Sequence, residues 1–251
     1  MIRTIACFIF AVLYLILSIP VLFFEWMFAK INKPASDLRC LRLVQWAFRV
    51  ICGICGVRTV IIGEENVPKD TAVLYAANHR SWFDILLTYS RTPGLTGFVA
   101  KDNIERIPLL SNWMKRLYCL FMSRDDVRAA LKCVLQGVEY LKKGVSIFIF
   151  PEGTRNKEEQ PLVLPFKEGS LKMAEKAGAP IIPVALTNTR EIFENHLPHA
   201  RPCKVIIEYG SPILVDELSK EEKKHLGSYT QHKIEEMLLK NAPLVSEKDA
   251  F

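Results

Sequence analysis

The chain has 251 residues, half of them hydrophobic, and a formal net charge of +6 at pH 7. This length suits one α/β domain with a smaller attached element, and the basic excess fits an anionic membrane surface or phosphate-bearing substrates. Nucleic acid is disfavoured as a partner because the sequence has no zinc-finger spacing, no arginine-rich tract and no aromatic RNA-binding signature.

The first apolar segment is predicted to meet membrane lipid. Residues 5–24 contain no charged side chain, and ~20 apolar residues are enough to cross a bilayer as a helix. A cleaved signal peptide is disfavoured because bulky residues such as Phe24 and Trp26 stand where a cleavage site needs small ones. Pro20 predicts a kink, so a tilted or re-entrant segment competes with a straight span. Basic residues cluster after the segment, which predicts an inner-membrane location with the catalytic part on the cytoplasmic side.

A second helix is predicted over residues 38–57, ending near Gly53 and Gly56. One side of this helix collects its polar residues, namely Arg39, Arg42, Gln45 and Arg49. A basic amphipathic helix beside an anchor favours a place at the membrane interface, and an ordinary surface helix packed on the main domain is the alternative. We therefore expect residues 1–57 to form an N-terminal membrane-anchoring helical element and residues 58–251 to form the catalytic domain.

The seven cysteines are odd in number and irregularly spaced, which is typical of free thiols in a reducing compartment. Cys52 and Cys55 form an isolated CxxC pair within an apolar stretch. A zinc site would need a second pair or nearby histidines, and the sequence offers neither. We interpret the pair as packing residues, with redox chemistry as the less favoured alternative.

The remainder of the chain is predicted to alternate strands and helices. The expected strands cover residues 57–63, 72–77, 95–100, 145–150, 181–186 and 204–209, and the expected helices cover residues 85–89, 169–177 and 217–239. Another helix begins after Asp125 or Asp126, ends before Gly144, and has an apolar face that includes Val127, Leu131 and Leu135. Continuous apolar strands alternating with helices predict an α/β fold with a mostly parallel central sheet flanked by helices.

The first polar motif follows the strand at residues 72–77. His79 stands two residues after that strand, and Asp84 follows five positions later at the start of a helix. This spacing allows Asp84 to orient the imidazole so that His79 can act as a general base. A purely structural pair, with Asp84 capping its helix, is an equally good interpretation of the spacing. Ser81 is expected to have a turn or capping role and no GxSxG elbow is present, so the base would activate a bound hydroxyl.

The second polar motif is Phe150–Arg155, which follows the strand at residues 145–150. Its glycine permits a tight turn, and the threonine and arginine after it offer donors to phosphate oxygens. A salt bridge between Glu152 and Arg155 that stabilises the turn is the alternative. Further positive charge is available from Lys101, Arg124 and Lys167.

Both motifs resemble signatures of the glycerolipid acyltransferases. Asn78–Asp84 is similar to the family's NHxSxxD signature, and Phe150–Arg155 is similar to its FPEGTR signature. The segments Lys101–Arg124 and Pro165–Val184 resemble two further blocks of the family in the expected order. Within the family the chain most resembles the bacterial PlsC-type 1-acyl-glycerol-3-phosphate acyltransferases.

The resemblance implies that His79 deprotonates the acceptor hydroxyl while Asp84 supports it. The residues that it implies for acceptor binding are Lys101, Arg124, Glu152, Gly153, Thr154 and Arg155, of which Lys101, Arg124 and Arg155 would face the phosphate. The expected acceptor is a lysophospholipid, and the donor is acyl-CoA or acyl carrier protein. Neither a cofactor nor a metal is expected, since the five histidines form no ligand cluster.

Two positions depart from the family's usual pattern and leave the acceptor open. Arg80 stands where glutamine is common, and Ser111 and Asn112 precede Trp113 where a glycine is usual. Glycerol-3-phosphate or another lysolipid therefore competes as the acceptor. A lipid hydrolase and a non-catalytic membrane-binding protein are alternatives from other functional classes.

Overall fold

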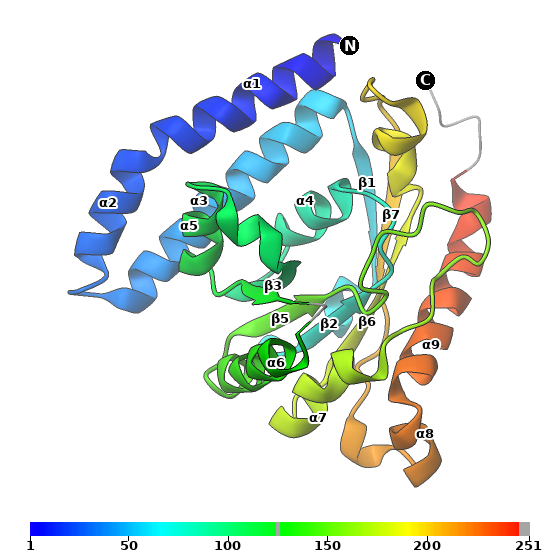
Figure 1. Cartoon of the computed structure of the whole chain (residues 1–251). Helices are drawn as coiled ribbons and strands as arrows, with labels where there is room; N and C mark the ends of the chain where they lie inside the picture. Colours follow the sequence, from blue (N-terminus) through cyan, green and yellow to red (C-terminus); the bar gives the residue numbers. More distant parts are fainter. Residues whose placement is uncertain (124–125, 246–251) are drawn as a thin grey trace.

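The computed structural model describes residues 1–123 and 126–245, and these residues form a sheet with helices packed against both faces (Figure 1). The strand order is β1-β7-β6-β2-β5-β3-β4. The strands are β1 (Arg58–Ile62), β2 (Leu74–Ala77), β3 (Thr96–Lys101), β4 (Leu120–Met122), β5 (Ser146–Ile149), β6 (Ile181–Thr187) and β7 (Lys204–Tyr209). All pairings are parallel except β6 with β7, so β1 and β7 run opposite to the other strands. The predicted α/β class with a mostly parallel sheet is confirmed.

Successive residues of the central strands point to opposite faces of the sheet, and each face has its own core. Tyr75 and Phe148 belong to the core shared with α3 (Lys33–Cys55), α4 (Phe83–Tyr89) and α5 (Leu110–Arg116). Leu74 and Ile147 belong to the core shared with α6 (Val127–Lys142) and α7 (Lys172–Ala177). Because both faces are covered, these strands consist of continuous apolar residues, which is the pattern the sequence shows.

Helix α6 begins and ends where the sequence predicted, and its buried face agrees with the predicted apolar face in part. Asp126 caps it by accepting hydrogen bonds from the backbone N–H groups of residues 128 and 129, while Asp125 lies outside the described residues. The predicted apolar face is wrong in part, because Val127, Leu131 and Leu135 are exposed. The buried residues of α6 are Cys133, Gly137, Val138 and Leu141. A Cβ atom at Gly137 would lie 2.4 Å from Sδ of Met173, so the glycine allows α6 and α7 to pack closely.

The C-terminal helical region, predicted as one helix over residues 217–239, is divided in two. Helix α8 (Lys220–Lys224) begins with a capping box formed by Ser219 and Glu222. Helix α9 (Leu226–Asn241) follows and packs through Ile234 and Leu238 against β6. The predicted helix is therefore two helices, of which the longer one packs on the sheet.

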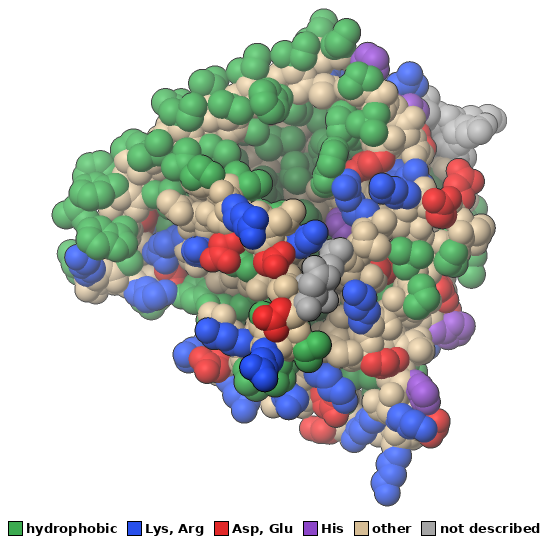
Figure 2. All heavy atoms as spheres, viewed as in Figure 1, with side chains coloured by type: hydrophobic (Ala, Val, Ile, Leu, Met, Phe, Trp, Pro, Cys, Tyr) green, Lys and Arg blue, Asp and Glu red, His purple; other side chains and the backbone are tan. Residues whose placement is uncertain are grey.

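The N-terminal region consists of α1 (Ile2–Leu17), α2 (Ile19–Phe28) and α3, with α1 lying along α3 (Figure 1). No single helix among the described residues is long and apolar enough to cross a membrane, but α1 and α2 together meet the length and composition as a pair bent by 43°. Pro20 is the second residue of α2, so the bend falls where the proline predicted a kink. Figure 2 shows hydrophobic side chains along the outer face of these helices. The exposed ones include Phe8, Leu13, Leu17, Phe23, Phe24 and Trp26.

Helix α3 begins five residues before its predicted start and ends at Cys55, followed by Gly56 in a left-handed backbone conformation. Its arginines are exposed as expected, whereas the expectation for Gln45 is wrong, since Gln45 is 1% exposed. The carboxamide of Gln45 donates to the carbonyl oxygens of Tyr89 and Thr92 at the end of α4. A buried polar group needs such partners, and these hydrogen bonds hold α3 against the C-terminal end of α4.

Candidate active site

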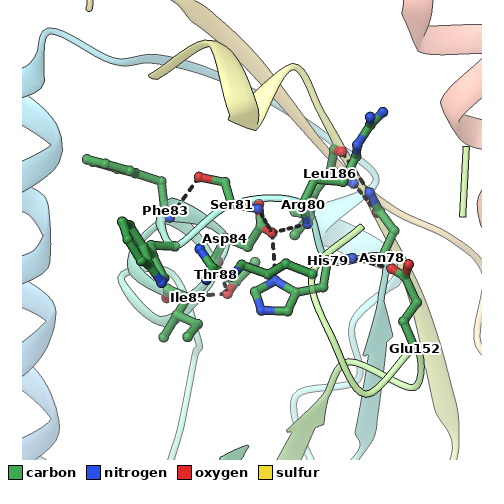
Figure 3. A network of polar contacts seen from close by, with 12 residues as sticks. Asn78, His79, Arg80, Ser81, Phe83, Asp84, Ile85, Thr88, Glu152 and Leu186 are labelled. Carbon is green, nitrogen blue, oxygen red and sulfur yellow. Dashed lines mark hydrogen bonds and ion pairs between the residues drawn. The ribbon is translucent and has the colours of Figure 1, made fainter. Parts of the chain in front are cut away.

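The structure brings His79 and Asp84 into direct contact (Figure 3). The two residues flank the turn between β2 and α4, and the Nδ1 atom of His79 lies 2.8 Å from Oδ2 of Asp84. A carboxylate can only accept a hydrogen bond, so Nδ1 carries the ring proton and Nε2 is left as an acceptor. The pair therefore has the geometry of a general base and its orienting group.

Asp84 also organises the turn that contains His79. Its side chain is fully buried, and Oδ2 accepts hydrogen bonds from the backbone N–H groups of Arg80 and Ser81, each at 2.7 Å. Asp84 does not cap α4, which was the structural alternative, because its partners Arg80 and Ser81 precede that helix. The other oxygen, Oδ1, is buried without a hydrogen-bond partner among the described residues. In Figure 3 the Arg80 side chain points away from the imidazole.

Ser81 has the turn role that was one of its two predicted roles, and it does not act as the N-cap of α4. Its hydroxyl accepts a hydrogen bond from the N–H of Phe83 at 3.0 Å and donates to the carboxylate of Glu194 at 2.7 Å. Neither contact involves His79, so Ser81 is not arranged as a nucleophile activated by that base.

The two polar motifs meet at one edge of the sheet because β2 and β5 are neighbouring parallel strands. The imidazole of His79 stacks on the ring of Phe150 with centroids 4.0 Å apart. The backbone N–H of His79 donates to the carboxylate of Glu152, and the N–H of Asn156 donates to the carbonyl of His79 at 2.7 Å. The second motif thus holds both the ring and the backbone of the histidine.

Glu152 is buried below the turn that contains His79. It is 4% exposed, and its second oxygen accepts from the N–H of Leu164 at 2.9 Å. Burial raises the pKa of Glu152 to about 7, against the lowering effect of its backbone hydrogen bonds from Leu164 and His79. The alternative of a salt bridge between Glu152 and Arg155 is wrong, because Arg155 pairs with Glu194 instead.

Gly153 allows a basic side chain to lie against the turn of the second motif. Its φ of +71° is in the left-handed region, and a Cβ atom there would come within 2.9 Å of Nζ of Lys167. Thr154 is exposed, and the guanidinium of Arg155 lies 4.4 Å above the ring of Trp82. The motif therefore gathers an exposed hydroxyl and two cations beside the turn of His79.

Lys101 and Arg124 are the other two basic residues that the family resemblance implies for phosphate binding. Lys101 is exposed at the end of β3, which is parallel to β5, so it lies at the same edge of the sheet as the two motifs. Arg124 lies outside the described residues. Figure 2 shows a hollow in this face of the molecule, bordered by hydrophobic side chains on one side and by Lys and Arg side chains on another.

Two residues of this arrangement were missed at the level of sequence. Asn78 is buried, and its carboxamide exchanges two hydrogen bonds with the backbone of Leu186, which ties the end of β2 to β6. Glu194 reaches the turn after His79 from a segment more than a hundred residues away along the chain. The asparagine is visible within the first motif, whereas no local pattern singles out the glutamate.

Comparison with known proteins identifies the family of this chain. The family model described as "Acyltransferase" matches residues 58–187. A 1-acyl-sn-glycerol-3-phosphate acyltransferase of Borreliella burgdorferi is 31% identical over 78% of this chain and 74% of its own length. A chloroplastic protein of the same name from Brassica napus, BAT2, is 36% identical over 64% of this chain and 48% of its own length.

A solved structure is similar over nearly the whole chain. The 1-acyl-sn-glycerophosphate acyltransferase PlsC from Thermotoga maritima has a TM-score of 0.82 and 26% sequence identity. The similarity covers 95% of this chain and 94% of that structure.

Proposed function

This chain belongs to the acyltransferase family, and we propose that it transfers a fatty acyl group to the free hydroxyl of 1-acyl-glycerol-3-phosphate, giving phosphatidate. The donor would be a thioester of coenzyme A or of acyl carrier protein. The observation that carries the proposal is the contact between His79 and Asp84 at a strand end, with cations of the neighbouring strand end beside it. The activity for which the relatives are named supports the choice of acceptor.

In the proposed reaction, Nε2 of His79 accepts the proton of the acceptor hydroxyl as its oxygen attacks the thioester carbonyl. A tetrahedral oxyanion forms, and Asp84 stabilises the imidazolium that now carries both ring protons. Collapse of the intermediate breaks the carbon–sulfur bond, and the departing thiolate takes the proton from the imidazolium. The histidine is thereby restored without a covalent acyl-enzyme.

Recognition of the acceptor phosphate is assigned to the basic side chains at the same edge of the sheet. The guanidinium of Arg155 is planar and offers paired N–H donors, while Lys101 and Lys167 add point charges. Arg124 is proposed as a further contributor from the resemblance alone. Gly153 and Thr154 would shape the turn, and Glu152 would act on the acceptor only indirectly, through the backbone of His79.

We propose that residues 1–57 anchor the protein at the cytoplasmic face of a membrane. This region combines the exposed apolar residues of α1 and α2 with six basic and two acidic side chains, a net +4 of the chain's +6. Apolar burial and attraction to anionic headgroups act together at such an interface. The anchor would keep the site of residues 58–251 beside a lipid acceptor and a lipid product.

The test is to incubate detergent-solubilised protein with oleoyl-CoA or oleoyl acyl carrier protein and 1-oleoyl-glycerol-3-phosphate, and to identify the lipid product by mass spectrometry. Formation of dioleoyl phosphatidate supports the proposal. Acylation of glycerol-3-phosphate alone, or release of free oleate, would contradict it and favour another acceptor or a hydrolase.

A further inference from the structure

A short segment beyond the family-matched residues contacts both signature motifs. It contains η4 (Thr189–Ile192) and η5 (Glu194–His196), which follow β6. Nη1 of Arg190 donates to the carbonyl of Lys157 at 2.6 Å, just after the second motif. Glu194, on the same segment, reaches the turn of the first motif. The segment therefore contacts the first motif and the residues that follow the second motif.

The carboxylate of Glu194 is shared between both motifs. Oε2 accepts a hydrogen bond from the hydroxyl of Ser81, and Oε1 accepts one from the backbone N–H of Trp82, each at 2.7 Å. Nη1 of Arg155 lies 3.7 Å from Oε1. The Glu194 side chain is 13% exposed, so its charge acts on these partners with less screening than a surface carboxylate would have.

Arg155 is held on two sides by this arrangement. Its guanidinium lies 4.4 Å above the ring of Trp82, whose backbone is itself fixed by Glu194. Within the described residues, Glu194 is the carboxylate that pairs with Arg155. A guanidinium restrained over one face and at one N–H group loses little freedom when its remaining donors bind an anion.

We propose that Glu194 is a positioning residue that fixes the guanidinium of Arg155 for the phosphate of the acceptor. This inference rests on the proposed function, since it assigns Glu194 a part in recognising that substrate. Glu194 acts on the reaction through Arg155 and contacts neither the reacting hydroxyl nor His79.

The variants Glu194→Ala and Glu194→Gln test the inference, with Glu191→Ala as the matched control. Glu191 is on the same segment, but its carboxylate bonds to His196 and Asn195 and not to either motif. We expect Glu194→Ala to raise KM for 1-oleoyl-glycerol-3-phosphate about tenfold with little change in kcat, because the ion pair that restrains the Arg155 guanidinium is lost. Glu194→Gln should give a smaller rise, since its carbonyl oxygen can still accept from Trp82, and the control should match the wild-type protein.

A double-variant cycle decides whether the effect passes through Arg155. We expect Arg155→Ala to raise KM as well, and the combination with Glu194→Ala to be little worse than Arg155→Ala alone. The inference would be overturned if the KM effects of the two substitutions multiplied in the double variant. It would also be overturned if Glu194→Ala lowered kcat and left KM unchanged, since Glu194 would then only support the turn of His79.

A measurement independent of turnover separates failure of this inference from failure of the proposed function. Phenylglyoxal modifies free guanidinium groups, and the rate at Arg155 can be followed by peptide mass spectrometry in lipid-free protein. We expect a faster rate in Glu194→Ala and Glu194→Gln than in the wild-type protein or Glu191→Ala. An unchanged rate would overturn the positioning role, whether or not the wild-type protein acylates 1-oleoyl-glycerol-3-phosphate.

Discussion

The imidazole of His79 lies nearly flat on the ring of Phe150, with the two ring planes inclined by only 19°. One residue follows β2 and the other follows β5, so the stacking sets the position of one signature motif against the other. The base is thus oriented by packing on one side and by the Asp84 carboxylate at its edge. Each of these restraints can be removed separately.

Removing the aromatic ring should loosen the histidine and destabilise the fold. Phe150 is 9% exposed, and replacing a buried phenylalanine by alanine costs about 3–5 kcal/mol. We expect Phe150→Ala to lower both kcat and the midpoint of urea unfolding, and Phe150→Leu to restore most of the stability but less of the kcat. Full kcat in the leucine variant would show that the stacked ring does not matter for catalysis.

Replacing Asp84 by asparagine tests the electrostatic restraint. The amide oxygen of asparagine can still accept from the backbone of Arg80 and Ser81, so the turn should persist. The variant lacks the charge that stabilises the imidazolium, and we expect kcat to fall at least about 100-fold. Circular dichroism provides the control for folding. A kcat close to that of the wild-type protein would leave Asp84 with a structural role only.

The buried carboxyl of Glu152 should make stability depend on pH. Its pKa is raised to about 7 in the folded protein from an ordinary value of 4.5, so between these values the folded state binds the proton more tightly. Stability from this group is therefore present below about pH 4.5 and is lost as the pH rises toward 7, by an amount on the order of 3 kcal/mol.

Glu152→Gln removes this titration while keeping the shape of the side chain. We expect the stability difference between the wild-type protein and the variant to favour the wild-type protein most at about pH 5 and to shrink by about pH 7.5. Urea unfolding at both pH values measures it. A difference that is constant, or that grows with pH, would show that Glu152 is ionised throughout this range.

Adding a methyl group at Gly153 should disturb the second motif. The left-handed conformation costs an alanine about 1–2 kcal/mol, and the new Cβ would displace the end of Lys167. We expect Gly153→Ala to lower the unfolding midpoint and to raise KM for 1-oleoyl-glycerol-3-phosphate. Gly94→Ala is the control, because a Cβ there has open space around it. Equal behaviour of the two variants would count against the close approach of Lys167.

The features predicted correctly from sequence are those with local signals. The strands β2 and β5 are short apolar runs that lead directly into polar residues, and the helix cap at Asp126 lies beside the residues that it caps. The contact between His79 and Asp84 is also local, since a single turn joins them. In each case the interacting groups are only a few residues apart.

The features missed depend on partners far along the chain. The antiparallel pairing of β6 with β7 and the edge position of β1 are decided by packing of the whole sheet. Gln45 has the sequence pattern of an outward polar residue, but it points inward and donates to the carbonyl oxygens of Tyr89 and Thr92. The role of Glu194 likewise cannot be predicted from sequence, because only the fold brings it into contact with Ser81 and Trp82.

The most direct test of the central claim is thiol release from oleoyl-CoA with and without 1-oleoyl-glycerol-3-phosphate, for the wild-type protein and His79→Ala. His232→Ala is the matched control, because His232 is an exposed residue of α9 paired with Glu236. We predict release that requires the acceptor in the wild-type protein and the control, and that is lost in His79→Ala. Release that is independent of the acceptor, or that survives in His79→Ala, would contradict acyl transfer with His79 as the base.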